Sequence, residues 1–205
     1  SMTWLRTTVD GKVFPADPRT LLGQAPPRPV IVGSNKVEFG SDREHRDAFI
    51  ALAFGANAEA ARGFYRADRP NPPDDPRLGS LDEQIGTDIT FRCPAERLAQ
   101  LLSGKGASVW RYEFDAAPNG GKTSHAAEIG YAFGDLKFAE GQSPGGLSLK
   151  PYWISFIRSG DPNASGLPQW PRFTPRTQQH ALFDSKGVTV EGPLRPQLCS
   201  LEDRL

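Results

Sequence analysis

The sequence predicts an α/β fold in which a mostly parallel sheet is flanked by helices, and three observations support this prediction. Residues 30–32 form a short apolar run that ends in a polar turn and Glu38. Residues 107–114 form a second strand-like run, and His125 follows it. Between and after these runs, apolar residues recur at helical spacing, which favours strands that are joined through helices. The carboxyl ends of such strands are where an open α/β sheet places its functional sites.

The elements in the first part of the chain are short, because 21 glycines and 19 prolines interrupt the sequence. Residues 7–14 predict a tight hairpin, and residues 20–22 predict a helical turn. Residues 41–44 have the spacing of a capping box, and Gly55 is a suitable stop for the helix that follows. The apolar face of this helix is expected at Ala48, Phe49, Leu52 and Ala53. A further helix is predicted over residues 59–65.

The elements of the later part are longer. Residues 80–83 predict a helix cap, and we expect the long helical region after it to be broken near Pro94. Residues 149–157 carry the clearest helical pattern, with apolar side chains at i, i+3, i+4, i+7 and i+8. These side chains are Leu149, Tyr152, Trp153, Phe156 and Ile157. The rest of the chain predicts a hairpin over residues 181–190 and a terminal helix over residues 196–205.

The composition excludes several classes of function. The 205 residues include 24 Lys plus Arg and 24 Asp plus Glu, and this balance gives no electrostatic case for binding nucleic acid or an anionic membrane. No apolar run approaches the roughly 18–20 residues of a membrane span. Ser1 and Met2 resemble a tag-cleavage scar, and no signal peptide follows them in this chain.

Glu38 and His125 are the candidate catalytic residues. A neutral imidazole can take or give a proton near pH 7, but a single histidine is more often structural than catalytic. Glu38 strengthens the case, because an acid that precedes the histidine follows the order of the α/β-hydrolase triad. In that order the nucleophile precedes both residues, so it would lie upstream of residue 1.

Five short motifs follow one another along nearly the whole chain. They are residues 9–15, the N-x-x-E segment at 35–38, the D-x-x-F-x-C-P segment at 88–94, the histidine segment at 124–134 and the late helix and loop over 152–171. In this order they resemble the C-terminal part of the type-B carboxylesterase family, which includes the cholinesterases. The resemblance implies the C-terminal portion of an α/β-hydrolase, with residues 1–205 as a single partial domain and the N-terminal half absent.

The chain departs from this family pattern in three ways. Phe39 and Gly40 follow the acid where a small residue is usual, and Ala126 replaces the usual glycine after the histidine. The G-x-S-x-G elbow and the glycine-rich oxyanion loop of the N-terminal half are not in the chain. Residues 141–145 match G-x-S-x-G as a pattern, but no strand precedes them and a proline follows the serine. We interpret them as a surface loop.

The resemblance implies a role for each candidate residue. Glu38 would orient His125 and stabilise its protonated form, and His125 would carry the proton of a serine nucleophile. Glu128 and Ser124 are candidates for a supporting role behind this pair, although a plain surface position explains Glu128 equally well. No cofactor or metal is implied. The other histidines, which lie in polar sequence, are interpreted as surface residues: His45 and His180.

The chain contains two cysteines, Cys93 and Cys199. Their spacing fits no metal motif, and composition alone favours two buried thiols slightly over a disulfide. The secreted members of the family bridge the corresponding positions. The resemblance therefore implies a Cys93–Cys199 disulfide and a secreted or periplasmic location.

The sequence thus predicts the acid-and-base part of a serine carboxylesterase, which hydrolyses carboxylic esters through an acyl-enzyme. The expected partners are a small-molecule ester and the missing N-terminal half. Self-association is also expected, because large exposed apolar faces mark interfaces. We expect the chain alone to be inactive, since it lacks the nucleophile and the oxyanion hole. The alternative is a non-catalytic, cholinesterase-like domain used for binding or adhesion, and the retention of both Glu38 and His125 argues for the enzyme.

Overall fold

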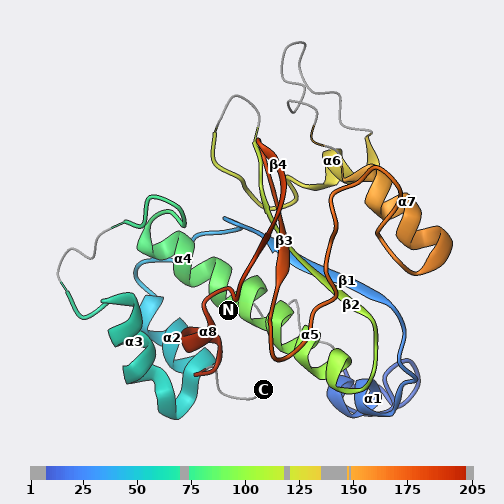
Figure 1. The fold of residues 1–205 in the computed structure, drawn as a ribbon. Helices are drawn as coiled ribbons and strands as arrows, with labels where there is room; N and C mark the ends of the chain where they lie inside the picture. Colours follow the sequence, from blue (N-terminus) through green and yellow to red (C-terminus); the bar gives the residue numbers. More distant parts are fainter. Residues whose placement is uncertain (1–7, 70–73, 118–120, 135–146, 148, 202–205) are drawn as a thin grey trace.

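The computed structural model describes residues 8–69, 74–117, 121–134, 147 and 149–201, and it confirms a mostly parallel sheet that is flanked by helices (Figure 1). Within these residues, four strands lie in chain order across the sheet. They are β1 (Val30–Asn35), β2 (Val109–Asp115), β3 (His180–Asp184) and β4 (Gly187–Glu191). The first three strands run parallel, and β4 turns back antiparallel to β3 as the predicted hairpin.

The helices lie largely where the sequence predicts them. They are α1 (Pro18–Gln24), α2 (Arg46–Phe54), α3 (Ala58–Tyr65), α4 (Leu81–Thr87), α5 (Cys93–Gly104), α6 (Ile129–Phe133), α7 (Lys150–Ser159) and α8 (Pro196–Cys199). A 3₁₀ turn, Gly55–Asn57, joins α2 to α3, and a π-helical segment, Asp88–Arg92, joins α4 to α5. No helix within the described ranges is long and apolar enough to cross a membrane.

The side chains of β2 alternate between two layers. On one side, Val109 packs with Ala99 of α5, and Arg111 pairs with Glu96 of the same helix. On the other side, aromatic side chains of β2 pack in a core that α6 and α7 complete. These side chains are Trp110, Tyr112 and Phe114. Both faces of β2 are therefore covered, because successive side chains of a strand point to opposite faces of the sheet.

A second core lies beside the sheet, where α2, α3, α4 and α8 pack together (Figure 1). Cys93 and Cys199 form the disulfide that the resemblance implies, and it joins the start of α5 to α8. The bridged residues are 106 apart in sequence. In the chain-entropy relation, a closed loop of this size contributes about 4–5 kcal/mol to stability.

Two predictions about the first part of the chain are wrong. Residues 8–14 form no hairpin, because Asp10 Oδ1 accepts the backbone N–H groups of Lys12, Val13 and Phe14 and so folds the segment into a local turn. Residues 41–44 form no capping box, since Ser41 Oγ donates to Asp82 instead and α2 begins only at Arg46.

The predicted helical faces are partly wrong. In α2, Ala48 and Leu52 are exposed, whereas the buried side chains are Ile50, Ala53 and Phe54. The helix is therefore rotated relative to the predicted face, because Ile50 lies against α3 and α4 in the second core. In α7, Ile157 is 75% exposed.

Two predicted helix ends also need correction. The helical region does not break at Pro94, because the chain widens into the π-helical segment just before it. Pro94 lies in the first turn of α5, where it removes no intrahelical hydrogen bond. The terminal helix extends only over α8, and residues 202–205 of the predicted span lie outside the described residues.

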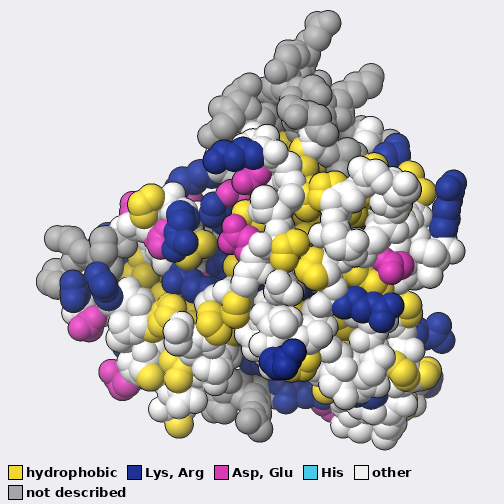
Figure 2. Space-filling model, in the orientation of Figure 1, with side chains coloured by type: hydrophobic (Ala, Val, Ile, Leu, Met, Phe, Trp, Pro, Cys, Tyr) yellow, Lys and Arg dark blue, Asp and Glu magenta, His cyan; other side chains and the backbone are white. Residues whose placement is uncertain are grey.

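Exposed hydrophobic side chains are spread over many elements. Those that are at least half exposed are Val9, Val13, Phe39, Leu52, Phe133 and Ile157. On the face drawn in Figure 2, hydrophobic side chains are interspersed with Lys and Arg. Self-association through exposed hydrophobic side chains stays a prediction.

The interpretation of His180 as a surface residue is wrong. His180 begins β3, which lies between β2 and β4, and it is 1% exposed. Burial and, to a smaller extent, the nearby positive charge of Arg111 together lower the pKa of its imidazole to about 4. The polar sequence around His180 does not reveal that its strand is an inner one.

We expect His180 to contribute to a loss of stability as the pH falls from about 6.5 to about 4. In this window the histidine is protonated in the unfolded chain but stays neutral in the folded chain. Protonation of the unfolded state therefore lowers the free energy of unfolding by up to about 3 kcal/mol. His180→Phe should remove this part of the pH dependence, and the surface variant His45→Phe should keep it. Urea unfolding at about pH 7 and about pH 4.5 measures the difference. An equal pH dependence in both variants would show that His180 does not titrate as a buried neutral group.

Candidate active site

The parallel pairing of β1 with β2 brings the carboxyl ends of both strands to one edge of the sheet. Asn35, the last residue of β1, is in register with Phe114 of β2. The N–H of Lys36 donates to the carbonyl oxygen of Phe114 at 2.8 Å. The loops that follow the two strands therefore start side by side, and they carry Glu38 and His125.

Glu38 and His125 are in direct contact. Glu38 Oε2 lies 2.8 Å from His125 Nδ1, and the backbone N–H of His125 donates to the carbonyl oxygen of Glu38 at 3.3 Å. The side chain of Glu38 is 5% exposed and that of His125 is 47% exposed. A buried carboxylate thus lies behind an imidazole that is half open to solvent.

Backbone and threonine contacts hold Glu38 in place. Its Oε1 accepts the backbone N–H of Asn35 at 2.7 Å, and its own N–H donates to Thr87 Oγ1 at 2.9 Å. The N–H of the preceding residue, Val37, donates to Thr123 Oγ1 at 3.2 Å. Thr87 belongs to α4 and Thr123 to the histidine loop, and both are buried. Sequence reasoning missed both threonines, and only the closeness of Thr123 to His125 could have indicated one of them.

The side chain of Asn35 connects the two loops. Its Nδ2 donates to the carbonyl oxygen of Ser124 at 2.9 Å and to Glu128 Oε2 at 2.7 Å, and it lies 3.5 Å from Glu38 Oε2. Ser124 is therefore engaged through its backbone and not through its hydroxyl in this contact. Glu128 is partly buried, and its contact with Asn35 connects it to the pair.

The environment of Glu38 has opposing effects on its carboxyl group. Burial raises the pKa of Glu38, whereas the N–H of Asn35 and the hydrogen bond with His125 lower it. The negative charge of Glu128 raises it again, and the net pKa lies above its ordinary value. A carboxylate that is partly shielded from water interacts more strongly with a positive imidazole than one in bulk water does.

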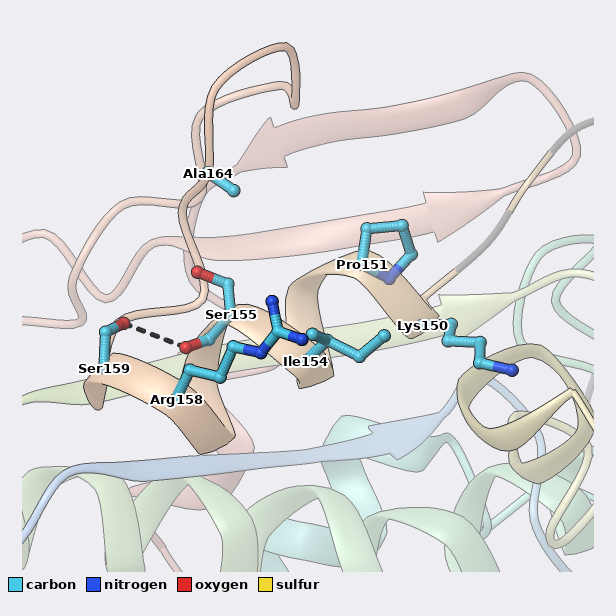
Figure 3. Close-up of a pocket in the computed structure, with 7 residues that line it drawn as sticks. All are labelled: Lys150, Pro151, Ile154, Ser155, Arg158, Ser159 and Ala164. Atoms are coloured by element: carbon cyan, nitrogen blue, oxygen red, sulfur yellow. Dashed lines mark hydrogen bonds between the residues drawn. The ribbon is translucent and has the colours of Figure 1, made fainter.

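One surface depression lies away from this pair. It has a volume of about 480 Å³ and lies along α7, where Ile154, Ser155 and Arg158 line it (Figure 3). Ser155 Oγ contacts the carbonyl oxygens of Asp161 and Asn163 at 2.8 and 3.0 Å, so its hydroxyl caps the loop that follows α7. Neither Glu38 nor His125 lines this depression, which we therefore do not regard as the active site.

The other sequence candidates do not form a second site. Among the described residues, no group of three or more His, Cys, Asp or Glu side chains could hold a metal ion. His45 is a surface residue as predicted, and its Nδ1 lies 2.8 Å from Asp42 at an exposed position. Residues 141–145, with the G-x-S-x-G pattern, lie outside the described residues.

Comparisons with known proteins agree on one family. The sequence model described as "Carboxylesterase family" matches residues 55–201. Carboxylesterase 1C from Rattus norvegicus is 29% identical over 203 residues, which cover 83% of this chain and 37% of the relative. Acetylcholinesterase from Gallus gallus is 30% identical over 137 residues, which cover 61% of this chain and 18% of the relative.

A solved structure shows the same relation. The structure titled "PNB ESTERASE" matches with a TM-score of 0.72 and 25% sequence identity, covering 94% of this chain and 42% of that chain. This chain thus spans less than half of the length of each of these relatives, between 18% and 42%.

Ala126, the residue after His125, has a strained backbone conformation. Its φ of +65° is left-handed, a conformation that costs a residue with a Cβ roughly 1–2 kcal/mol. We expect Ala126→Gly to raise the free energy of unfolding by about 0.5–1 kcal/mol, because the relieved strain exceeds the extra chain entropy of glycine. Ala48→Gly, at an exposed right-handed position in α2, should lower it by about 1 kcal/mol. If urea unfolding showed equal losses in both variants, Ala126 would carry no strain.

Proposed function

The chain belongs to the carboxylesterase family, and we propose that it supplies the acid and the base of an ester hydrolase whose nucleophile lies in another part of a longer protein. The observation that carries this proposal is the 2.8 Å contact between Glu38 Oε2 and His125 Nδ1. The contact places a buried carboxylate behind a half-exposed imidazole, which is the arrangement that proton transfer to and from a serine requires.

In the proposed reaction, His125 Nε2 takes the proton of the serine hydroxyl as the serine oxygen attacks the carbonyl carbon of a carboxylic ester. The same proton then passes to the alkoxy leaving group, and an acyl-enzyme remains. Water attacks the acyl carbon in the second half, and His125 again accepts and returns a proton. Glu38 keeps the other proton on Nδ1 and stabilises the imidazolium that forms in both halves.

Asn35 supports this role, because it joins the loop of Glu38 to the loop of His125. The acid and the base are 87 residues apart in sequence, and the bonds of Asn35 add to the backbone bond between His125 and Glu38 in holding their loops together. A binding or adhesion domain would not need a buried carboxylate aimed at an imidazole, so the geometry favours the enzyme over that alternative.

The proposal extends to the rest of the protein. Residues 1–205 would be one partial domain, completed by a part that carries the serine and the oxyanion hole. A small-molecule ester would be the substrate, and the chain alone should show negligible hydrolysis of p-nitrophenyl acetate. The Cys93–Cys199 disulfide is compatible with an oxidising environment, so we propose a secreted or periplasmic location.

The test compares two histidines that each face a carboxylate. In the longer protein that carries the serine, His125→Ala should lower kcat/KM by at least about 10³-fold, because the serine loses its base. Glu38→Gln should lower it by about 10²–10⁴-fold, since the neutral amide no longer stabilises the imidazolium.

The matched control is His45→Ala, which removes the exposed contact between His45 and Asp42 and should leave kcat/KM unchanged. If His125→Ala and His45→Ala had the same small effect on ester hydrolysis, His125 would not be the base.

A further inference from the structure

Three aromatic rings meet at the candidate active site. The ring centroid of His125 lies 4.4 Å from that of Phe39 and 5.2 Å from that of Phe91. The two phenylalanine rings are 5.6 Å apart, so each ring contacts both others. The interplanar angles with His125 are 35° and 46°, which are tilted packing geometries.

These rings come from three separate elements. Phe39 follows Glu38 in the loop after β1, Phe91 belongs to the π-helical segment Asp88–Arg92, and His125 lies in the loop after β2. The packing of the rings therefore joins both catalytic loops to the helical layer. The hydrogen bonds around Glu38 do not involve the imidazole ring beyond Nδ1.

One hydrogen bond does not fix the orientation of an imidazole. The outer torsion of a histidine side chain is broad and roughly two-fold, and the His125 side chain is 47% exposed. The contact at Nδ1 restrains one ring atom, and the ring plane can still swing about it. Among the described residues, Phe39 and Phe91 are the aromatic rings that limit this swing.

The backbone of Phe39 is firmly placed although its side chain is 50% exposed. A Cβ added at Gly86 of α4 would lie 2.3 Å from the carbonyl oxygen of Phe39, so the helix approaches this loop at backbone contact. The N–H of Ser41 also donates to the carbonyl oxygen of Asp82 in α4 at 2.7 Å. These contacts fix the backbone position from which the ring of Phe39 reaches the imidazole of His125.

The position of Phe91 depends on the π-helical segment. The wider turn changes the direction of the side chains relative to α4, and such segments are frequent at functional sites. Arg92, the next residue, is fully buried and donates through Nη2 to the carbonyl oxygen of Lys36 at 2.7 Å. The segment is therefore tied directly to the loop that carries Glu38.

We propose that Phe39 and Phe91 are positioning residues that hold the imidazole of His125 in the orientation needed for proton transfer. They act through His125 and take no part in bond making. The inference rests on the proposed function, because an orientation matters only if His125 carries a proton.

The first measurement uses this chain alone and does not depend on catalysis. In ¹H–¹³C NMR spectra, the ring protons of His125 should lose the upfield ring-current shift in Phe39→Ala, and Phe39→Tyr should restore it. Phe133→Ala is the matched control, because Phe133 is 54% exposed and is not among the ring neighbours of His125 within the described residues. Phe39 is half exposed, so its replacement should leave the chain folded.

The second measurement uses the longer protein that carries the serine. Phe39→Ala should lower kcat by about 10- to 100-fold with KM nearly unchanged for a small ester, because the base is misoriented but the substrate contacts remain. Phe39→Tyr should recover most of kcat, and Phe133→Ala should have no effect.

The outcomes separate the inference from the proposed function. If His125→Ala leaves ester hydrolysis unchanged, the proposed function fails whatever the NMR spectra show. If His125 is required but Phe39→Ala changes neither its ring signals nor kcat, the positioning role fails alone. A lower melting temperature of Phe39→Ala with unchanged His125 signals would assign Phe39 a merely structural role and also overturn the inference.

Discussion

The parallel pairing of β1 with β2 is the constraint on which the candidate site depends. It brings two strand ends that are far apart in the sequence to one edge, so Glu38 and His125 leave the sheet from neighbouring loops. Asn35 extends this pairing beyond the strands, because its side chain bonds the histidine loop while its N–H bonds the carboxylate of Glu38. A strand register shifted by one residue would turn Asn35 to the other face and separate the pair.

Buried charged side chains connect the segments that meet at this edge of the sheet. Arg92 is fully buried and pairs with Asp88 in its own helical segment and with Glu113 of β2. It also donates to the carbonyl oxygen of Lys36, which lies between the end of β1 and Glu38. Burying charges has a large desolvation cost, so such pairs are weak evidence for stability. Their directional hydrogen bonds instead fix the π-helical segment, β2 and the acid loop relative to one another.

Local patterns were sufficient to predict the strands, most of the helices and the contact between Glu38 and His125, because motif order and strand ends are visible in the sequence. The errors arise where another interaction outweighs the pattern. The carboxylate of Asp10 accepts the N–H groups that a hairpin would have paired, and the polar residues before the predicted strand conceal the burial of His180 at its start. The contacts of Asn35 and the rings around His125 join distant segments, and no single-sequence period reports them.

Glu38 is proposed to hold His125 in the neutral tautomer that has its proton on Nδ1, which leaves Nε2 free to accept a proton. Long-range ¹H–¹⁵N NMR spectra of the neutral imidazole distinguish the two tautomers directly. We expect His125 to carry its proton on Nδ1, next to Glu38 Oε2 at 2.8 Å, and Glu38→Ala to abolish this preference. A proton on Nε2 in the unaltered chain, or a tautomer that does not respond to Glu38→Ala, would contradict this proposal.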